Sequence, residues 1–275
     1  MVRRLERIAP QHAQLIASAT TATFIAGGEQ AADFINEGVP RVVVRFDVTN
    51  DFAVRQMRQN DLRLVREFTN EQAQAASQAL NRSVNEGRNP REAARIFRGS
   101  IGLTSRQELA VANYRRALET GDRDALRRAL RDRRFDRTVL RSIETGRPLS
   151  AEQVDRFTER YRQRWIRFRS ETIARTEALR AANGGSFRMY QQAVQEGVID
   201  PLAIRRRWIP TRDNRLRDSH AAVPRLNPDG VGYDQPFVTG NGNFLLHPGD
   251  PNAPASDTVN CRCAVTVRLE DPDNG

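Results

Sequence analysis

One long apolar stripe constrains the fold of this chain more than any other feature. Between Ser150 and Ala182, large apolar side chains recur at spacings of three to five residues in an otherwise charged segment, which is the pattern of one face of an α-helix. This pattern predicts a long helix whose apolar face forms core rather than a surface on which nucleobases stack. The stripe consists of Val154, Phe157, Tyr161, Trp165, Phe168 and Ile173.

Helix-start signals extend the helical pattern upstream of the stripe. Thr69–Gln72, Thr104–Gln107 and Ser150–Gln153 each place Ser or Thr three residues before Gln, the capping-box spacing that satisfies amide donors at a helix start. Asn89-Pro90 adds an Asn cap followed by Pro at the first helical position. With Gly-containing turns between these signals, we expect about five or six helices over residues 61–185.

Two further segments bound this helical region. Asn183-Gly184-Gly185 predicts a break, after which Ser186–Glu196 reads as a separate helix. In the opening residues, Gly27-Gly28 also predicts a break. Further on, Arg41–Asn50 alternates valine and phenylalanine with mostly polar residues. That alternation is typical of a β-strand, which would have to pair within the N-terminal arm, with the C-terminal part or with another chain.

The composition changes after Ile199, where Pro, Gly, Asn and Asp become frequent and the apolar runs become short. Ala264–Val267 alternates directly after Cys263, which predicts a strand that begins at the cysteines. The expected fold class is therefore α+β, with an elongated multi-helix body, a small loop-rich α+β C-terminal module and a short N-terminal β-strand arm. The expected boundaries are 1–60, 61–185 and 186–275.

The charge of the chain favours an anionic partner. All 44 basic residues are arginine, against 34 acidic residues, which leaves a net charge of +10. A GC-rich genome would be one explanation for the missing lysine, but the net charge still favours polyanions, and DNA bound without sequence readout is the first partner to consider. An anionic membrane surface or an acidic protein are the alternatives. The candidate DNA contacts are Arg133, Arg134, Arg205, Arg206 and Arg207.

The sequence gives no indication of a membrane span or of secretion. No apolar run approaches the ~18 residues that a span requires, and no apolar signal core follows Arg3 and Arg4. The two cysteines, Cys261 and Cys263, are too close in sequence for a good disulfide. We therefore expect a reduced, intracellular protein without a membrane partner.

The cysteine pair also predicts a metal site. Cys261 and Cys263 would project to the same side of an extended strand, and His220 and His247 could complete a tetrahedral Cys2His2 zinc set. Asp213, Asp218 or Asp250 could supply an oxygen ligand in place of His247. The competing interpretation is that the thiols are small buried residues and the histidines surface groups.

Enzymatic interpretations have weaker support, and we assign no catalytic residue. His220 with Asp213, Asp218 and Cys261 could form a nucleophile and base, and His220 with Asp213 and Arg215 could form a metal-dependent nuclease. No turn signature around either cysteine supports an activated thiol, and polar residues of a loop-rich module often form a nuclease-like set by chance. The catalytic alternative is therefore a metal-dependent nuclease or a transferase-like enzyme in the C-terminal module. Phosphate-binding glycine motifs are absent from the sequence.

Ordered motifs in the last part of the chain resemble a known family. ARTEALRAANGG (174–185) is followed by Trp208, Asp213, Arg215, Arg217, Asp218 and His220 at fixed spacing, then by HPGDP and NCRC. This order resembles the phage Mu F-like head morphogenesis, or minor capsid, family over residues 155–268, and Ile101–Glu119 resembles the helical region of its members. The motif residues here are Trp208, Asp213, Arg215, Arg217, His220, Asp250, Asn260, Cys261 and Cys263.

The resemblance implies a phage minor head protein that acts in head morphogenesis. Such a protein would be present in few copies at or near the portal inside the capsid, in contact with portal protein, other capsid proteins and packaged DNA. It would occupy the host cytoplasm during assembly, and the family is not generally assigned a required catalytic activity. His247 falls where relatives can carry another residue.

Overall fold

The computed structural model describes residues 9–38, 45–46 and 102–270, together with the isolated positions 91, 94, 95 and 98. It is a mixed α+β structure, which confirms the expected fold class. Its elements in chain order are α2 (Ala9–Gly38), α6 (Ser105–Glu119), η3 (Arg123–Arg127), η4 (Arg133–Phe135), α7 (Asp136–Thr145), α8 (Ala151–Gln195), η5 (Pro201–Ala203), β1 (Ile204–Ile209), α9 (Asp218–Ala221), α10 (Val223–Leu226), β2 (Phe237–Val238), β3 (Phe244–Leu245), α11 (Ala255–Thr258) and β4 (Ala264–Leu269).

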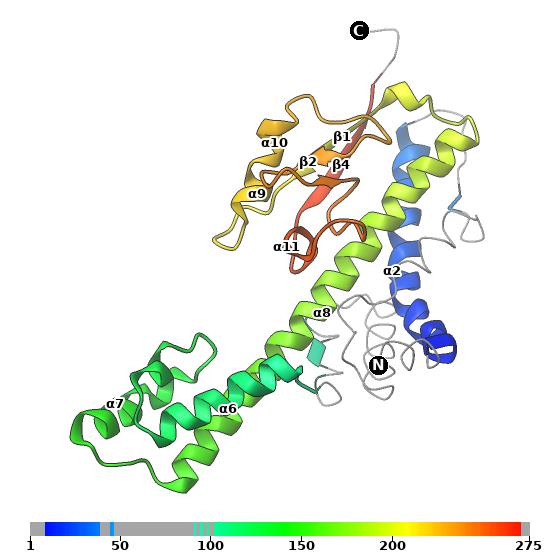
Figure 1. Cartoon of the computed structure of the whole chain (residues 1–275). Helices are drawn as coiled ribbons and strands as arrows, with labels where there is room; N and C mark the ends of the chain where they lie inside the picture. Colours follow the sequence, from blue (N-terminus) through cyan, green and yellow to red (C-terminus); the bar gives the residue numbers. More distant parts are fainter. Residues whose placement is uncertain are drawn as a thin grey trace.

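Helix α8 is the element on which the other parts pack. It begins at the capping box of Ser150 and Gln153, as predicted, and continues for 45 residues. Figure 1 shows α6 and α7 at its start, and α2 and the C-terminal module on opposite sides of its second half. The capping box of Thr104 and Gln107 also forms, at the start of α6, whereas Thr69–Gln72 and Asn89-Pro90 lie outside the described residues.

The apolar stripe of α8 forms core along most of its length. Val154, Phe157 and Tyr161 are buried against α6, α7 and the turns between them, and Tyr114 of α6 lies with its ring centroid 4.3 Å from that of Tyr161. The exception is Phe168, which is 45% exposed. The core interpretation of the stripe therefore holds at its start and fails at Phe168.

Glycines in the middle of α2 and α8 allow these helices to pack closely. A Cβ atom added to Gly27 would lie 2.2 Å from the Ala182 carbonyl oxygen, and one added to Gly185 would lie 1.8 Å from the Phe24 carbonyl oxygen. Both helices continue through these glycines. The predicted breaks at Gly27-Gly28 and Asn183-Gly184-Gly185 are therefore wrong, because these glycines provide room for a neighbouring backbone rather than a turn.

The structure describes only part of the N-terminal arm, so it tests only some of the predictions made for this arm. The structure has a continuous helix over Ala9–Gly38, where we expected a break at Gly27-Gly28. Of the predicted strand Arg41–Asn50, only Arg45 and Phe46 are described, and they are not in a strand. The remainder of that strand prediction lies outside the described residues.

The C-terminal module is built on a two-stranded antiparallel sheet. Strand β1 pairs with β4 in a register that places Trp208 opposite Val265, which confirms the strand predicted after the cysteines. A second short pair, β2 with β3, completes the described strands. Apolar side chains on the inner side of these elements pack together with both cysteines; the buried members are Trp208, Val223, Val231, Phe237, Leu245, Ala253, Cys261 and Cys263. Among the described helices, none is long and apolar enough to cross a bilayer.

Candidate metal centre

Three of the predicted ligands lie together in the core of the C-terminal module. The Nδ1 atom of His220, in α9, is 3.6 Å from the sulfur of Cys261 and 3.5 Å from that of Cys263. All three ligand atoms lie within 4.8 Å of one another, and none of these residues is more than 2% exposed. This group could hold a metal ion.

The two thiols are electronically unequal. Hydrogen bonding from Cys261, assisted by His220, lowers the pKa of Cys263 to about 4 against the opposing effect of burial. The same interaction, together with burial, raises the pKa of Cys261. This pairing favours the thiolate form at one sulfur, and thiolate is the form that binds metal.

Asp257 lies behind the imidazole of His220. Its Oδ1 atom is 3.6 Å from His220 Nε2, on the side of the ring opposite to the thiols. The carboxylate is fully buried and accepts hydrogen bonds from Ser219, Asn241 and Asn243. Carboxylates that accept a hydrogen bond from the far nitrogen orient metal-binding histidines in proteins; here the carboxylate lies at ion-pair distance, and Nε2 has no hydrogen-bond partner among the described residues.

The sequence analysis did not identify Asp257. The only signal was its place four residues before Cys261 in a polar turn, and a single carboxylate at such a spacing is too common to single out. Trp208, by contrast, was identified as a motif residue. Its ring lies edge-on to that of His220, with centroids 5.3 Å apart, so Trp208 packs against the imidazole, while the Asp257 carboxylate approaches Nε2 without forming a hydrogen bond to it.

His247 does not join this group, so the structure does not assemble the expected Cys2His2 set. Its ring packs against Phe187 of α8 at 5.6 Å between centroids, and Nδ1 lies 3.2 Å from the Pro248 carbonyl oxygen. Burial lowers the pKa of His247. His247 lies apart from the cysteines because its loop, HPGDP, is held against α8, where Arg180 donates a hydrogen bond to the Gly249 carbonyl oxygen.

The aspartates considered as substitute ligands are also engaged or remote. Asp250 accepts hydrogen bonds from the backbone of Leu246 and Asn252, and Asp213 forms a two-pronged ion pair with Arg262. Asp218 is exposed at the start of α9, whereas His220 is buried. The acid–base and nuclease sets considered from the sequence are therefore not brought together with the His220 ring.

Asn260 joins the turn that carries both cysteines to α8; this turn, residues 259–263, is named the metal-binding turn after the group that could hold a metal ion. Asn260 has a left-handed backbone conformation, with a φ of 57°, which Asn tolerates better than most residues. Its backbone N–H donates to Thr176 Oγ1 over 2.9 Å, its side-chain Nδ2 donates to Thr172 Oγ1 over 3.2 Å, and its Oδ1 accepts from Arg175 over 3.3 Å. These three partners lie on one face of α8, so a single residue fixes the turn against the helix.

Of the candidate DNA contacts, one arginine is buried and the others are accessible. Arg206 is 2% exposed and donates to the backbone carbonyls of Gly232, Gln235 and Leu246, so its prediction as a DNA contact is wrong. Alternation along β1 directs this side chain into the module.

The other candidates are at least partly accessible. Arg205 pairs with Glu270 and Arg134 pairs with Asp132. Arg133 and Arg207 are exposed. These four remain predictions as DNA contacts.

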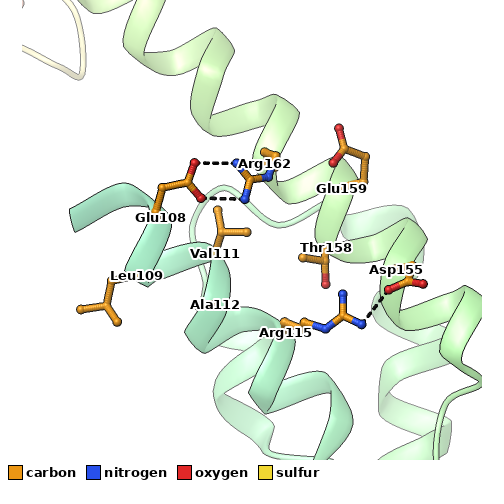
Figure 2. Close-up of a pocket in the computed structure, with 9 residues that line it drawn as sticks. All are labelled: Glu108, Leu109, Val111, Ala112, Arg115, Asp155, Thr158, Glu159 and Arg162. Carbon is orange, nitrogen blue, oxygen red and sulfur yellow. Dashed lines mark hydrogen bonds and ion pairs between the residues drawn. The ribbon is translucent and has the colours of Figure 1, made fainter. Parts of the chain in front are cut away.

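The described residues form a larger and a smaller hollow beside α8. The larger, of about 720 Å³, lies between α6 and α8. Figure 2 shows that its arginines bind carboxylates of the same hollow: Arg162 contacts Glu108 through two hydrogen bonds, and Arg115 reaches Asp155. The smaller, of about 350 Å³, lies where the metal-binding turn meets α8.

Comparisons with models of protein families, with curated proteins and with solved structures found no match to this chain.

Proposed function

We propose that this protein is a phage minor head protein that acts in head morphogenesis at or near the portal, in contact with packaged DNA. One observation carries the proposal. The first motif, which includes His220, and the Asn-Cys-x-Cys motif lie about 40 positions apart in the sequence, yet His220 contacts both Cys261 and Cys263, and Asp213 pairs with Arg262 between the cysteines. That two motifs distant in sequence meet in one group supports the proposal that they form a single site.

The role we propose is structural rather than catalytic, with portal and capsid proteins as partners. The C-terminal module is small and carries few large apolar side chains, and small modules of this kind gain stability from a metal or another cross-link. The motif residues Trp208 and Asn260 support this view, because they fix the imidazole and the metal-binding turn by packing and hydrogen bonds.

We also propose that the metal is zinc. Bonds of about 2.3 Å to sulfur and about 2.0 Å to nitrogen at tetrahedral angles would separate the nitrogen and each sulfur by about 3.5 Å. The separations of His220 Nδ1 from Cys261 and Cys263 are 3.6 and 3.5 Å. When bound, zinc would cross-link α9 to the segment that leads into β4.

Metal content tests the zinc proposal directly, because the same separations also suit S–H···N hydrogen bonds. The purified chain is expected to contain about one zinc per molecule by mass spectrometry, and a chelator is expected to lower its melting temperature. Cys263→Ser should lose the metal, whereas the control His247→Gln should keep it. A metal-free chain with an unchanged melting temperature in chelator would refute the zinc proposal.

The alternative function is a metal-dependent enzyme, because three protein ligands leave a fourth position for water. His220→Ala separates the two functions. In a structural site the variant loses metal and thermal stability together, whereas in a catalytic site it keeps its fold and loses turnover.

Purified particles test the head assignment. We expect the protein in the virion at low copy number, and we expect aberrant heads or poor DNA retention when the gene is disrupted. Normal heads that lack the protein would refute the assignment.

A further inference from the structure

The smaller hollow gathers positive charge from separate parts of the chain. One wall belongs to α8, another to the loop before α9, and the third to the metal-binding turn. Alternation at the cysteines explains the third wall, since Cys261 and Cys263 point into the module and Arg262 points the other way. The lining residues are Phe168, Glu171, Thr172, Arg175, Arg215, Arg217, Asn260 and Arg262.

The arginines of this hollow are not neutralised in the way that those of the larger hollow are. Glu171 is the sole carboxylate in the lining, against four arginines. Arg262 is bound by Asp213 at the edge, but neither Arg175 nor Arg215 forms an ion pair with a carboxylate in the described part of the chain. Burial and the neighbouring arginines, Arg262 first among them, lower the pKa of Arg175.

Hydrogen-bonding capacity remains within the hollow. Arg175 donates from Nη1 to Asn260, and Arg217 donates from Nη2 to the Val259 carbonyl oxygen. A guanidinium group carries five N–H donors, so most of these donors stay available. Convergent guanidinium groups of this kind match the oxygens of a phosphate.

Phe168 adds an apolar face to the same hollow. It is 45% exposed although it belongs to the apolar stripe of α8, and Trp165 supports it edge-on with ring centroids 5.9 Å apart. An exposed aromatic ring beside guanidinium groups is the combination on which unpaired nucleobases stack while their phosphates are neutralised.

We propose that this hollow binds a nucleotide of an unpaired nucleic-acid strand, with the phosphate held by Arg175 and Arg215 and the base stacked on Phe168. In a duplex the bases are paired and stacked on one another, so they cannot reach Phe168. This proposal therefore adds to the proposed contact with packaged DNA a separate site that binds a strand end or an unpaired segment.

Binding of labelled oligonucleotides to the full chain tests the proposal. Fluorescence polarisation would compare a single-stranded oligothymidylate with a duplex of equal length. Arg175→Gln/Arg215→Gln is expected to weaken single-strand binding by about tenfold or more, and Phe168→Ala by about fivefold or more. Arg215→Gln alone serves as a second variant, because this exposed side chain has no ion pair to lose among the described residues.

The matched control is Arg137→Gln/Arg141→Gln, which removes the same charge from exposed positions on α7. Weakening of less than about twofold in the control supports a specific site, as does a salt dependence that becomes shallower only in the hollow variants. Equal weakening by the control would overturn the proposal in favour of diffuse charge. Tighter binding of the duplex with no effect of Phe168→Ala would overturn it in favour of a duplex surface. Equal competition by inorganic phosphate and by thymidine monophosphate would reduce the hollow to a simple anion site. None of these outcomes depends on the presence of the protein in phage particles.

Discussion

Replacement of Asn260 tests how the C-terminal module is attached to α8. Asn260 combines a left-handed backbone conformation with two side-chain hydrogen bonds, to Thr172 and Arg175. Asn260→Gly removes the side-chain hydrogen bonds but tolerates the φ of 57°. Asn260→Ala removes the same bonds and also has to adopt an unfavourable conformation.

The expected magnitudes follow from these two contributions. Two side-chain hydrogen bonds of moderate length contribute about 1–2 kcal/mol in total. The left-handed conformation costs alanine about 1 kcal/mol more than it costs glycine. We therefore expect Asn260→Gly to lower the free energy of unfolding by about 1–2 kcal/mol and Asn260→Ala by about 2–3 kcal/mol.

Urea unfolding followed by tryptophan fluorescence measures this difference. In a Trp165→Phe background, the remaining Trp208 reports on the C-terminal module, because its ring is buried against His220. Thr176→Val serves as a third variant, since it removes the acceptor of the Asn260 backbone N–H. Equal destabilisation by Gly and Ala would show that the backbone conformation is not decisive, and unchanged stability in all three variants would refute the attachment itself.

Three other replacements give separate tests, the first two by the same unfolding measurement and the third by proteolysis. Arg206→Met should destabilise the module by roughly 3–6 kcal/mol, because three hydrogen bonds from a buried charged donor to backbone carbonyls are lost. Arg206→Lys should be nearly as destabilising, and a loss below about 1 kcal/mol would contradict this role. Burial raises the pKa of Glu177 to about 7, so the folded state binds a proton that the unfolded state releases, and stability should fall by roughly 3 kcal/mol as pH rises from about 4.5 to 7. Glu177→Gln should lack this decline, and parallel pH profiles of variant and parent would refute it. Gly185→Ala should separate α2 from α8, because the added methyl group overlaps the Phe24 carbonyl oxygen; unchanged protease resistance of α2 would count against that close contact.

Local signals in the sequence predicted local structure well. The capping boxes at Thr104 and Ser150 form because their hydrogen bonds depend only on neighbouring residues. The strand after Cys263 forms for a similar reason, since alternation fits one buried face. Glycine was misinterpreted at Gly27 and Gly185, where the requirement for a small residue comes from another helix. A contact between helices distant in sequence leaves no local signal.

The candidate site was predicted only in part, because some of its contacts follow from local spacing and others depend on residues distant in sequence. The spacing of Cys261 and Cys263 placed both thiols on one side of the chain, and His220 joined them as expected. His247 and Arg206 were misplaced, because loop packing on α8 and the direction of a side chain from β1 determine where they lie. Asp257 was missed, since its role depends on the position of a histidine 37 residues earlier in the sequence.

The continuity of α8 sets a fixed distance within the molecule. At about 1.5 Å per residue, its 45 residues span about 68 Å from end to end. A continuous helix, packed by α6 and α7 at its start and by α2 and the C-terminal module along its second half, transmits position between these parts without a hinge. Partners bound at the two ends would therefore be kept at a constant spacing and rotation, and an insertion of even one residue in α8 would turn one partner by about 100° relative to the other.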